Sequence, residues 1–277
     1  MFSIHTSKRD SIILDNKEFF FLAGIIGSDH LLGVENPYQG YVAEELAEEW
    51  KKTQISLLDK GYLIKDKNEN KFSIPPIVFS RVAIACLAER TCWFKYSDGT
   101  NTKEIYLHVT NERVVQVCND HDHHRKYYKL DDCGNIEEAC HKIIDKFDML
   151  DDLQSDMPAL MFSQQQFNEI YEQSQSSDVD VLIQKLAEAS NDIEGSNLLA
   201  QCLRHRSAEG EFHLSIWTGD EWETQQLAFL MNDSINWLIR QSVESDQDWL
   251  IASPISKRDF QDTLLRWLQQ SSQSDLG

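Results

Sequence analysis

The sequence contains little glycine and proline, and it is short of positive charge. Its 277 residues include 11 Gly and 5 Pro, about half of what average usage supplies. We therefore do not expect a glycine-rich phosphate-binding loop. The 26 Lys and Arg stand against 46 Asp and Glu, which gives a formal net charge of −20. Because this charge repels nucleic-acid phosphates and anionic lipids, we expect neither nucleic acid nor a membrane as a partner.

Long hydrophobic runs and clustered cysteines are also missing. The longest apolar run near the start, 19–26, is interrupted by Gly24 and is too short to cross a bilayer. The first ten residues lack the basic and apolar regions of a signal peptide, so we expect a cytoplasmic protein. The six cysteines are scattered, which is typical of reduced thiols without disulfides.

The first half of the sequence is predicted to contain helices followed by antiparallel strands. Asp15 and Glu18 form a capping-box pattern at the start of an apolar helix over 15–26. Apolar residues at helical spacing predict a second helix over 41–60, which Gly61 ends. The remaining predicted elements are a hairpin over 62–74, a helix over 77–89, strands at 91–96, 104–110, 113–118 and 126–130, and a helix over 135–148.

The second half repeats this order, which predicts an α+β fold made by a pseudo-twofold duplication of a unit of helices and an antiparallel meander. The acidic segment 148–156 is the predicted linker, which gives an N-terminal half at 1–150, a C-terminal half at 151–270 and a disordered tail at 271–277. The predicted elements of the second half are helices at 163–174 and 179–189, strands at 199–205, 212–218 and 221–229, a turn at 208–210, a helix carrying Ile235, Leu238 and Ile239, a strand at 248–252 and a helix at 256–270.

Two alternative functions depend on single segments. The helix and hairpin over 41–74 resemble a winged helix, which would suit a transcriptional regulator, but the helix carries Glu44, Glu45, Glu48 and Glu49 where DNA binding needs basic residues. The loop 121–124 with its neighbour Asp120 (Asp-His-Asp-His-His) is the densest group of metal-ligand residues and would suit a metal-dependent enzyme. Adjacent residues of one loop do not easily close a tetrahedron, and we find no catalytic motif. We predict no catalytic residue, no metal site and no cofactor.

Tryptophan is concentrated near the end of the sequence, where five of the seven lie in the last 61 residues. Trp217 and Trp222 flank the tight turn of a predicted hairpin, where burial is difficult and an aromatic side chain suits protein recognition. The predicted helix after the hairpin offers Trp237 and Leu238. We predict that Trp217, Trp222, Trp237 and Leu238 contact a protein partner.

Three segments resemble the EspG family, cytosolic chaperones of type VII (ESX) secretion systems. They are Leu14-Asp15-x-x-Glu18-Phe19 before an apolar helix, the segment from Glu44-Glu45 to Leu57-Leu58-Asp59-Lys60-Gly61-Tyr62-Leu63, and the 212–229 hairpin with its Gly-Asp-Glu-Trp turn. The resemblance covers about residues 10–270. It implies a pseudo-twofold α+β fold and the binding of helical secreted substrates, of the WXG type or similar to PE/PPE proteins, before export. It implies no individual contact residue, and it leaves the oligomeric state open.

Overall fold

The computed structural model describes residues 11–28, 32–66, 71–122, 125–152, 157–242 and 248–270. The chain divides into two compact units that do not follow the order of the sequence. Unit 1 contains Met1–Thr91 and Ile105–Ile136, and unit 2 contains Cys92–Glu104 and Glu137–Gly277. The predicted boundary at residue 150 separates two repeats of the same order of helices and strands along the chain. The two units, in contrast, are groups of residues that contact one another in space. The first repeat therefore contributes two segments to unit 2, Cys92–Glu104 and the stretch that begins at Glu137.

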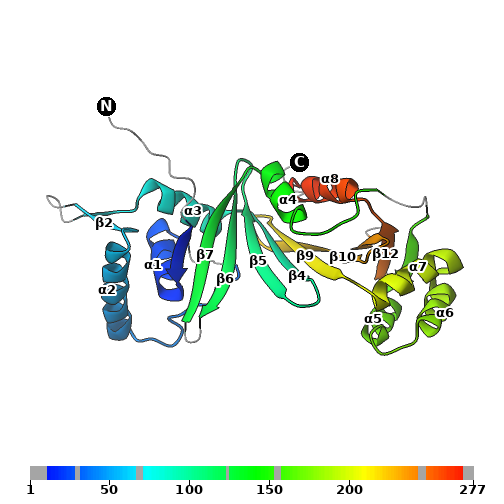
Figure 1. Cartoon of the computed structure of the whole chain (residues 1–277). Helices are drawn as coiled ribbons and strands as arrows, with labels where there is room; N and C mark the ends of the chain where they lie inside the picture. The colour runs from blue at the N-terminus through cyan, green and yellow to red at the C-terminus, as the bar shows by residue number, and fades with distance from the viewer. Residues whose placement is uncertain are drawn as a thin grey trace. The chain divides into compact units, whose positions relative to one another are not determined.

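Unit 1 combines helices with antiparallel strands (Figure 1). Its strands follow the order β1-β7-β6-β5. The elements are β1 (Ile12–Asp15), α1 (Asn16–Ile26), α2 (Ala43–Asp59), β2 (Ile64–Lys65), β3 (Phe72–Ser73), α3 (Pro76–Leu87), most of β5 (Thr102–Val109), β6 (Val114–Asp122) and β7 (Arg125–Gly134). The core lies where α1 and α3 cover β1, β6 and β7, and it includes Phe19, Leu22, Val82, Tyr128 and Leu130.

The start of α1 agrees with the predicted capping box. The Asp15 side chain accepts a hydrogen bond from the backbone N–H of Glu18 at 2.8 Å, and the Glu18 carboxylate accepts one from the backbone N–H of Asp15 at 2.8 Å. Glu18 is fully buried, and it also accepts hydrogen bonds from Ser56 at 2.7 Å and from the Lys60 ammonium at 2.6 Å. The capping residue therefore also fixes the end of α2 against α1.

The segment 41–74 forms the predicted helix and hairpin, although each hairpin strand has only two residues. Glu44, Glu45 and Glu48 are exposed on α2. Because this helix face is acidic, it does not resemble a DNA-recognition helix.

Unit 2 contains the strand order β4-β9-β10-β11-β12-β8, with neighbouring strands antiparallel from β9 to β8. Its elements are β4 (Arg90–Ser97), α4 (Ile136–Ile144), β8 (Leu160–Ser163), α5 (Gln164–Gln173), α6 (Val179–Ser190), α7 (Ile193–Arg204), β9 (Ala208–Trp217), β10 (Trp222–Met231), β11 (Asn236–Gln241), β12 (Trp249–Pro254) and α8 (Lys257–Leu268). The first residues of β4 and α4 belong to unit 1, because unit 2 begins at Cys92 in β4 and at Glu137 in α4.

Unit 2 has two hydrophobic clusters. Helices α5, α6 and α7 pack against β8, β11 and β12, with Leu186, Leu203 and Trp237 among the buried residues. Under α4 and α8, an aromatic cluster joins β4, β9 and β10, and its members are Phe94, Phe147, Phe212, Phe229 and Phe260. The side chains of His141 on α4 and Gln261 on α8 lie 3.1 Å apart, so these two helices lie side by side (Figure 1).

The order of elements repeats along the chain, in agreement with the predicted α+β duplication. Each repeat consists of a short strand, three helices, four strands and a final helix, and β2 and β3 are inserted in the first repeat. The short first strand pairs with the last strand of its own repeat, β1 with β7 and β8 with β12. Both first strands were missed, because four-residue strands directly before a helix cap have too little sequence for a pattern of period two.

Three local predictions in the second half are wrong. Residues 199–205, predicted as a strand, belong mostly to α7, which Asp192 caps by accepting a hydrogen bond from the backbone N–H of Gly195 at 2.8 Å. The predicted helix with Ile235, Leu238 and Ile239 is strand β11, which is buried on both faces and therefore lacks alternation. The predicted turn at 208–210 is the start of β9. Gly210 is needed there, since a Cβ atom would lie 2.4 Å from the Phe229 ring.

Within the described ranges, no helix combines the length and the apolar character that a bilayer crossing requires.

Candidate functional site

One face of β9 and its neighbouring strands in unit 2 carries polar and aromatic side chains. Residues of β9 alternate, so that Phe212, Leu214 and Ile216 point into the aromatic cluster and are buried. The residues between them point to the opposite side and are half-buried. This sheet face consists of Glu209, Glu211, His213, Ser215 and Trp217 on β9, Trp222, Thr224 and Gln226 on β10, and Trp93 and Lys95 on β4.

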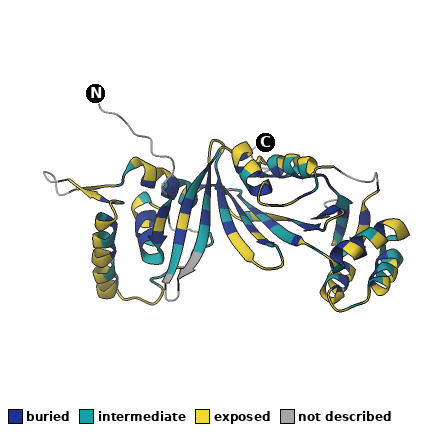
Figure 2. Cartoon of the chain, in the orientation of Figure 1, coloured by how far each residue is buried: buried dark blue, intermediate teal, exposed yellow. Residues whose placement is uncertain are grey.

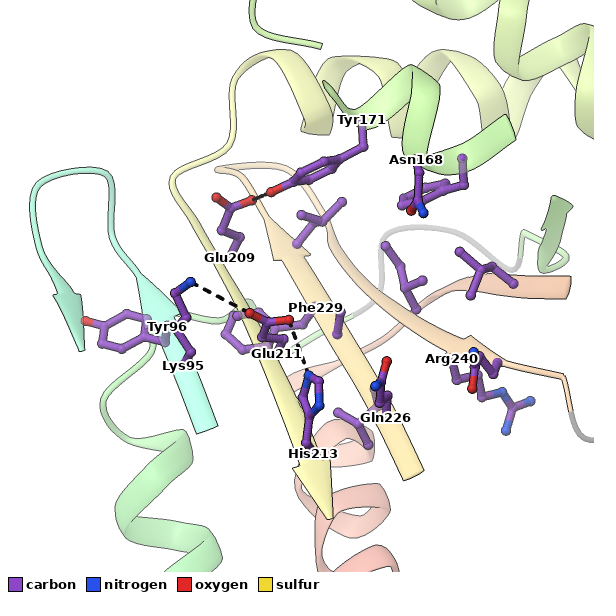
Figure 3. Close-up of a pocket in the computed structure, with 18 of the residues that line it drawn as sticks. Lys95, Tyr96, Asn168, Tyr171, Glu209, Glu211, His213, Gln226, Phe229 and Arg240 are labelled. Carbon is purple, nitrogen blue, oxygen red and sulfur yellow. Dashed lines mark hydrogen bonds and ion pairs between the residues drawn. The ribbon is translucent and has the colours of Figure 1, made fainter. Parts of the chain in front are cut away.

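A pocket of about 510 Å³ lies on this sheet face, where α5 approaches the strands. Asn168 and Tyr171 of α5 line one side, and Arg240 of β11 lines another (Figure 3). Apolar atoms of Phe167, Leu230, Ile239 and Leu250 form part of its wall. Apolar walls with a few placed polar groups are typical of sites that bind another molecule.

Tyr171 of α5 and Glu209 of β9 line the pocket where α5 meets the sheet, and Arg206 contacts both side chains. The Tyr171 hydroxyl donates a hydrogen bond to Glu209 at 2.6 Å, and the Arg206 guanidinium forms an ion pair with the same carboxylate oxygen at 3.0 Å. Arg206 also lies over the Tyr171 ring, 4.9 Å from its centroid. Burial and the neighbouring carboxylate raise the pKa of Tyr171 far above its ordinary value. The phenol therefore stays protonated and acts as a fixed hydrogen-bond donor.

The opposite side of the pocket carries three charged or titratable groups on two neighbouring strands. Glu211 lies 3.9 Å from the Lys95 ammonium and 3.4 Å from His213 Nε2 (Figure 3). Lys95 and Glu211 keep 49% and 44% of their side-chain area exposed. Because both signs of charge are accessible, this side can bind either the carbonyl groups or the N–H groups at the end of a partner helix.

Aromatic side chains continue the sheet face beyond the pocket. The Trp93 ring meets the His213 ring edge to face, with centroids 4.7 Å apart, and Trp93 Nε1 donates a hydrogen bond to Glu104 at 2.5 Å. Trp217 and Trp222 pair directly across the β9–β10 hairpin, with ring centroids 5.4 Å apart. All three tryptophans are half-buried, so part of each ring remains accessible.

The four predicted contact residues separate into two groups. Trp217 and Trp222 lie together on the sheet face as neighbours across the hairpin. Trp237 has no exposed surface and Leu238 keeps 5% of its own, because β11 is a central strand covered on both faces. These two side chains stabilise the interior of unit 2, and a partner does not reach them in this conformation.

The sequence interpretation missed Lys95, Glu209, Glu211 and His213 on β9 and β4. A signal for them exists, since polar residues at 209, 211, 213 and 215 alternate with apolar residues at 212, 214 and 216. The prediction of a turn at 208–210 interrupted this alternation. Tyr171 could not be found from sequence, because only the tertiary fold brings α5 beside β9.

No group of three or more His, Cys, Asp or Glu that could hold a metal ion occurs among the residues the structure describes. The loop 121–124, with His121, His123 and His124, lies outside the residues whose side chains are described. The predicted metal alternative therefore stays a prediction.

No protein-family model matches the chain, and no curated protein matches its sequence. Among solved structures, the chain is similar to the type VII secretion system chaperone EspG5 of Mycobacterium tuberculosis, which was determined in complex with a PE25–PPE41 dimer. The similarity has a TM-score of 0.63 at 12% sequence identity and covers 92% of this chain and 94% of EspG5. The chain therefore has the α+β fold of EspG5, as the resemblance in the sequence implied.

Proposed function

We propose that this chain is a cytoplasmic chaperone of a type VII secretion system, and that it binds a helical export substrate on the sheet face of unit 2. The substrate would be a helical protein of the WXG type or similar to PE/PPE proteins, held until export. The observation that carries the proposal is an accessible sheet face with aromatic side chains and a polar pocket, in a chain that has the fold of EspG5 over almost its whole length.

The composition of the sheet face supports protein binding. Tryptophan and tyrosine supply large contact areas with few rotatable bonds, and they dominate the affinity of many protein interfaces. Here Trp93, Trp217 and Trp222 lie on one face and Tyr171 lies at its end. The partly exposed pair of Lys95 and Glu211 gives a polar rim that fixes orientation.

The pocket supports binding of the end of a helix in particular. The first four N–H groups and the last four C=O groups of a helix lack partners inside the helix. Lys95, Gln226 and Arg240 can donate hydrogen bonds to such carbonyls, while Glu211 can accept bonds from such N–H groups. A helix tip whose apolar side chains enter the pocket would therefore satisfy its backbone groups as well.

Replacing Trp217 and Trp222 together by alanine is expected to weaken binding of the substrate by at least about 30-fold, because each ring would lose a large contact area. Stability should change little, since a cross-strand aromatic pair contributes about 1 kcal/mol. The measurement is calorimetric titration with a purified helical protein of the WXG or PE/PPE type from the same organism, together with thermal melts of the unmodified chain and the double variant.

The matched control is Trp50→Ala, which removes a tryptophan that is 44% exposed on α2 of unit 1. It should leave the affinity unchanged. Equal losses of affinity for the control and the double variant, or an unchanged affinity for the double variant, would remove the sheet face as the binding surface.

A further inference from the structure

Charge and exposed hydrophobic side chains are distributed unequally between the two units. Unit 1 has 15 Lys and Arg against 18 Asp and Glu, a net charge of −3, whereas unit 2 has 11 against 28, a net charge of −17. Of the 14 large hydrophobic residues that are exposed among the described residues, 11 belong to unit 1. The charges of unit 1 therefore nearly balance, and unit 1 carries most of the large hydrophobic side chains that are exposed.

Helix α3 carries three of these exposed hydrophobic residues. Its sequence, PIVFSRVAIACL, contains one charged residue, Arg81, and that side chain is buried. Val78, Val82 and Ala85 pack into the core of unit 1. On the outer side, Ile77, Phe79 and Leu87 keep 54%, 49% and 57% of their areas exposed. Figure 2 shows the exposed stretches of α3.

A helix with this composition is normally covered on all sides. Surface helices carry charged and polar residues on the side away from the core, and a helix that is hydrophobic all round is buried. Outward-facing Ser80 is the one polar residue that α3 exposes. The exposed α3 face, formed by Ile77, Phe79, Ser80, Ala83 and Leu87, therefore has the character of an interface.

We propose that the exposed α3 face binds the same face of a second copy of this chain, and that the two α3 helices pack antiparallel about a twofold axis. Large side chains lie at both ends of the face, and the small residues Ser80 and Ala83 lie between them. In an antiparallel pair the small residues meet at the crossing, where they allow close approach, while Ile77 of each copy lies beside Leu87 of the other.

The charge distribution favours a second copy at this place. Two chains that each carry a net charge of −20 repel each other. The repulsion is weakest when the chains meet through unit 1, whose net charge is −3, and through a helix face that has no charged groups. The three large side chains of each copy leave roughly 100 Å² apiece exposed, or roughly 600 Å² for the pair of copies. This is below the roughly 1,000 Å² of a specific interface, so the residues around them must supply the rest. We therefore expect a dimer of micromolar affinity.

Sedimentation equilibrium of the full chain over a wide range of concentration tests the proposal. The unmodified chain should dimerise, and Ile77→Lys and Leu87→Glu should each weaken the dimer by more than about 100-fold, because each would bury unpaired charges. Ile193→Glu is the control, since Ile193 is 66% exposed on α7 of unit 2 and should not affect the association. Circular-dichroism melts of each variant report whether it folds.

Mixing the two α3 variants tests the antiparallel arrangement itself. A dimer of one Ile77→Lys chain and one Leu87→Glu chain places the new lysine beside the new glutamate, while the second contact keeps its original Ile77 and Leu87. The mixture should therefore recover at least about tenfold in affinity over either variant alone. A monomeric unmodified chain, a dimer that resists the α3 changes, or a mixture of folded variants that remains monomeric would each overturn the proposal.

Discussion

Phe212→Ala is expected to lower the free energy of unfolding by about 4 kcal/mol, which would be among the largest effects of a single substitution in this chain. Phe212 is fully buried on β9 and stacks on Phe94 with ring centroids 4.2 Å apart. Phe229, Phe260 and Trp267 contact it from β10 and α8. Because aromatic rings surround it from several elements, the cavity left by alanine cannot collapse easily.

Urea denaturation followed by near-ultraviolet circular dichroism measures this effect. Met161→Ala is the control, since Met161 is 49% exposed on the short edge strand β8, and its truncation should cost less than about 1 kcal/mol. A cost for Phe212→Ala as small as that of the control would mean that the aromatic cluster does not hold α8 on the sheet.

Glu18→Ala is expected to lower the free energy of unfolding by about 3 kcal/mol. The substitution removes half of the capping box of α1 and leaves the Lys60 ammonium and the Ser56 hydroxyl without their carboxylate partner. The Glu18 side chain keeps only 1% of its area exposed, so water cannot replace the lost bonds without a rearrangement of α1 and α2.

Glu45→Ala provides a matched control for Glu18→Ala. Glu45 has the same position in the capping box of α2, where its carboxylate accepts a hydrogen bond from the Val42 backbone at 3.3 Å, but it is exposed. Its removal should cost about 0.5 kcal/mol. Equal costs for the two glutamates, measured by urea denaturation, would show that the buried contacts of Glu18 to α2 contribute nothing.

Local chemistry in the sequence predicted most of the fold. Asp15 and Glu18, Ser163 and Gln166, and Ser256 and Asp259 are capping pairs whose hydrogen bonds form in the structure, so the starts of α1, α5 and α8 are determined by adjacent residues. Alternation of the apolar residues Ile105, Leu107 and Val109 predicted β5, and the strand predicted at 212–218 corresponds to the outer part of β9. In β9 one face packs on the aromatic cluster, while the side chains of the other face are half-buried.

Elements that are buried on both faces were predicted poorly. In β11, Trp237 lies among the helices of unit 2 and its neighbour Leu238 is buried on the other side of the strand, so the sequence shows a continuous apolar run. A run of this kind does not distinguish a central strand from a buried helix. The same ambiguity affected the Leu-Leu-Ala-Gln-Cys-Leu stretch of α7, which the sequence interpretation assigned to a strand.

The candidate site was predicted in part. The turn residues Gly219 and Asp220 placed Trp217 and Trp222 at a hairpin tip, because such turns are encoded locally. The contact of Tyr171 with Glu209 and the approach of Lys95 to Glu211 join residues 38 and 116 positions apart, and no local pattern encodes them. Side chains of a site can be predicted from one strand, whereas the pocket they form depends on how strands and helices pack.

The central claim, that the substrate lies on the sheet face of unit 2, is tested most directly by site-specific photo-crosslinking at two adjacent residues of β10. Thr224 and Glu223 are both exposed, but Thr224 pairs with Ser215 on the sheet face, whereas Glu223 pairs with Ile216, whose side chain points toward the aromatic cluster. With a helical protein of the WXG or PE/PPE type from the same organism, a photoreactive residue at Thr224 should give a crosslinked complex, and one at Glu223 should give little. Equal crosslinking at both positions, or crosslinking at Glu223 alone, would contradict the claim.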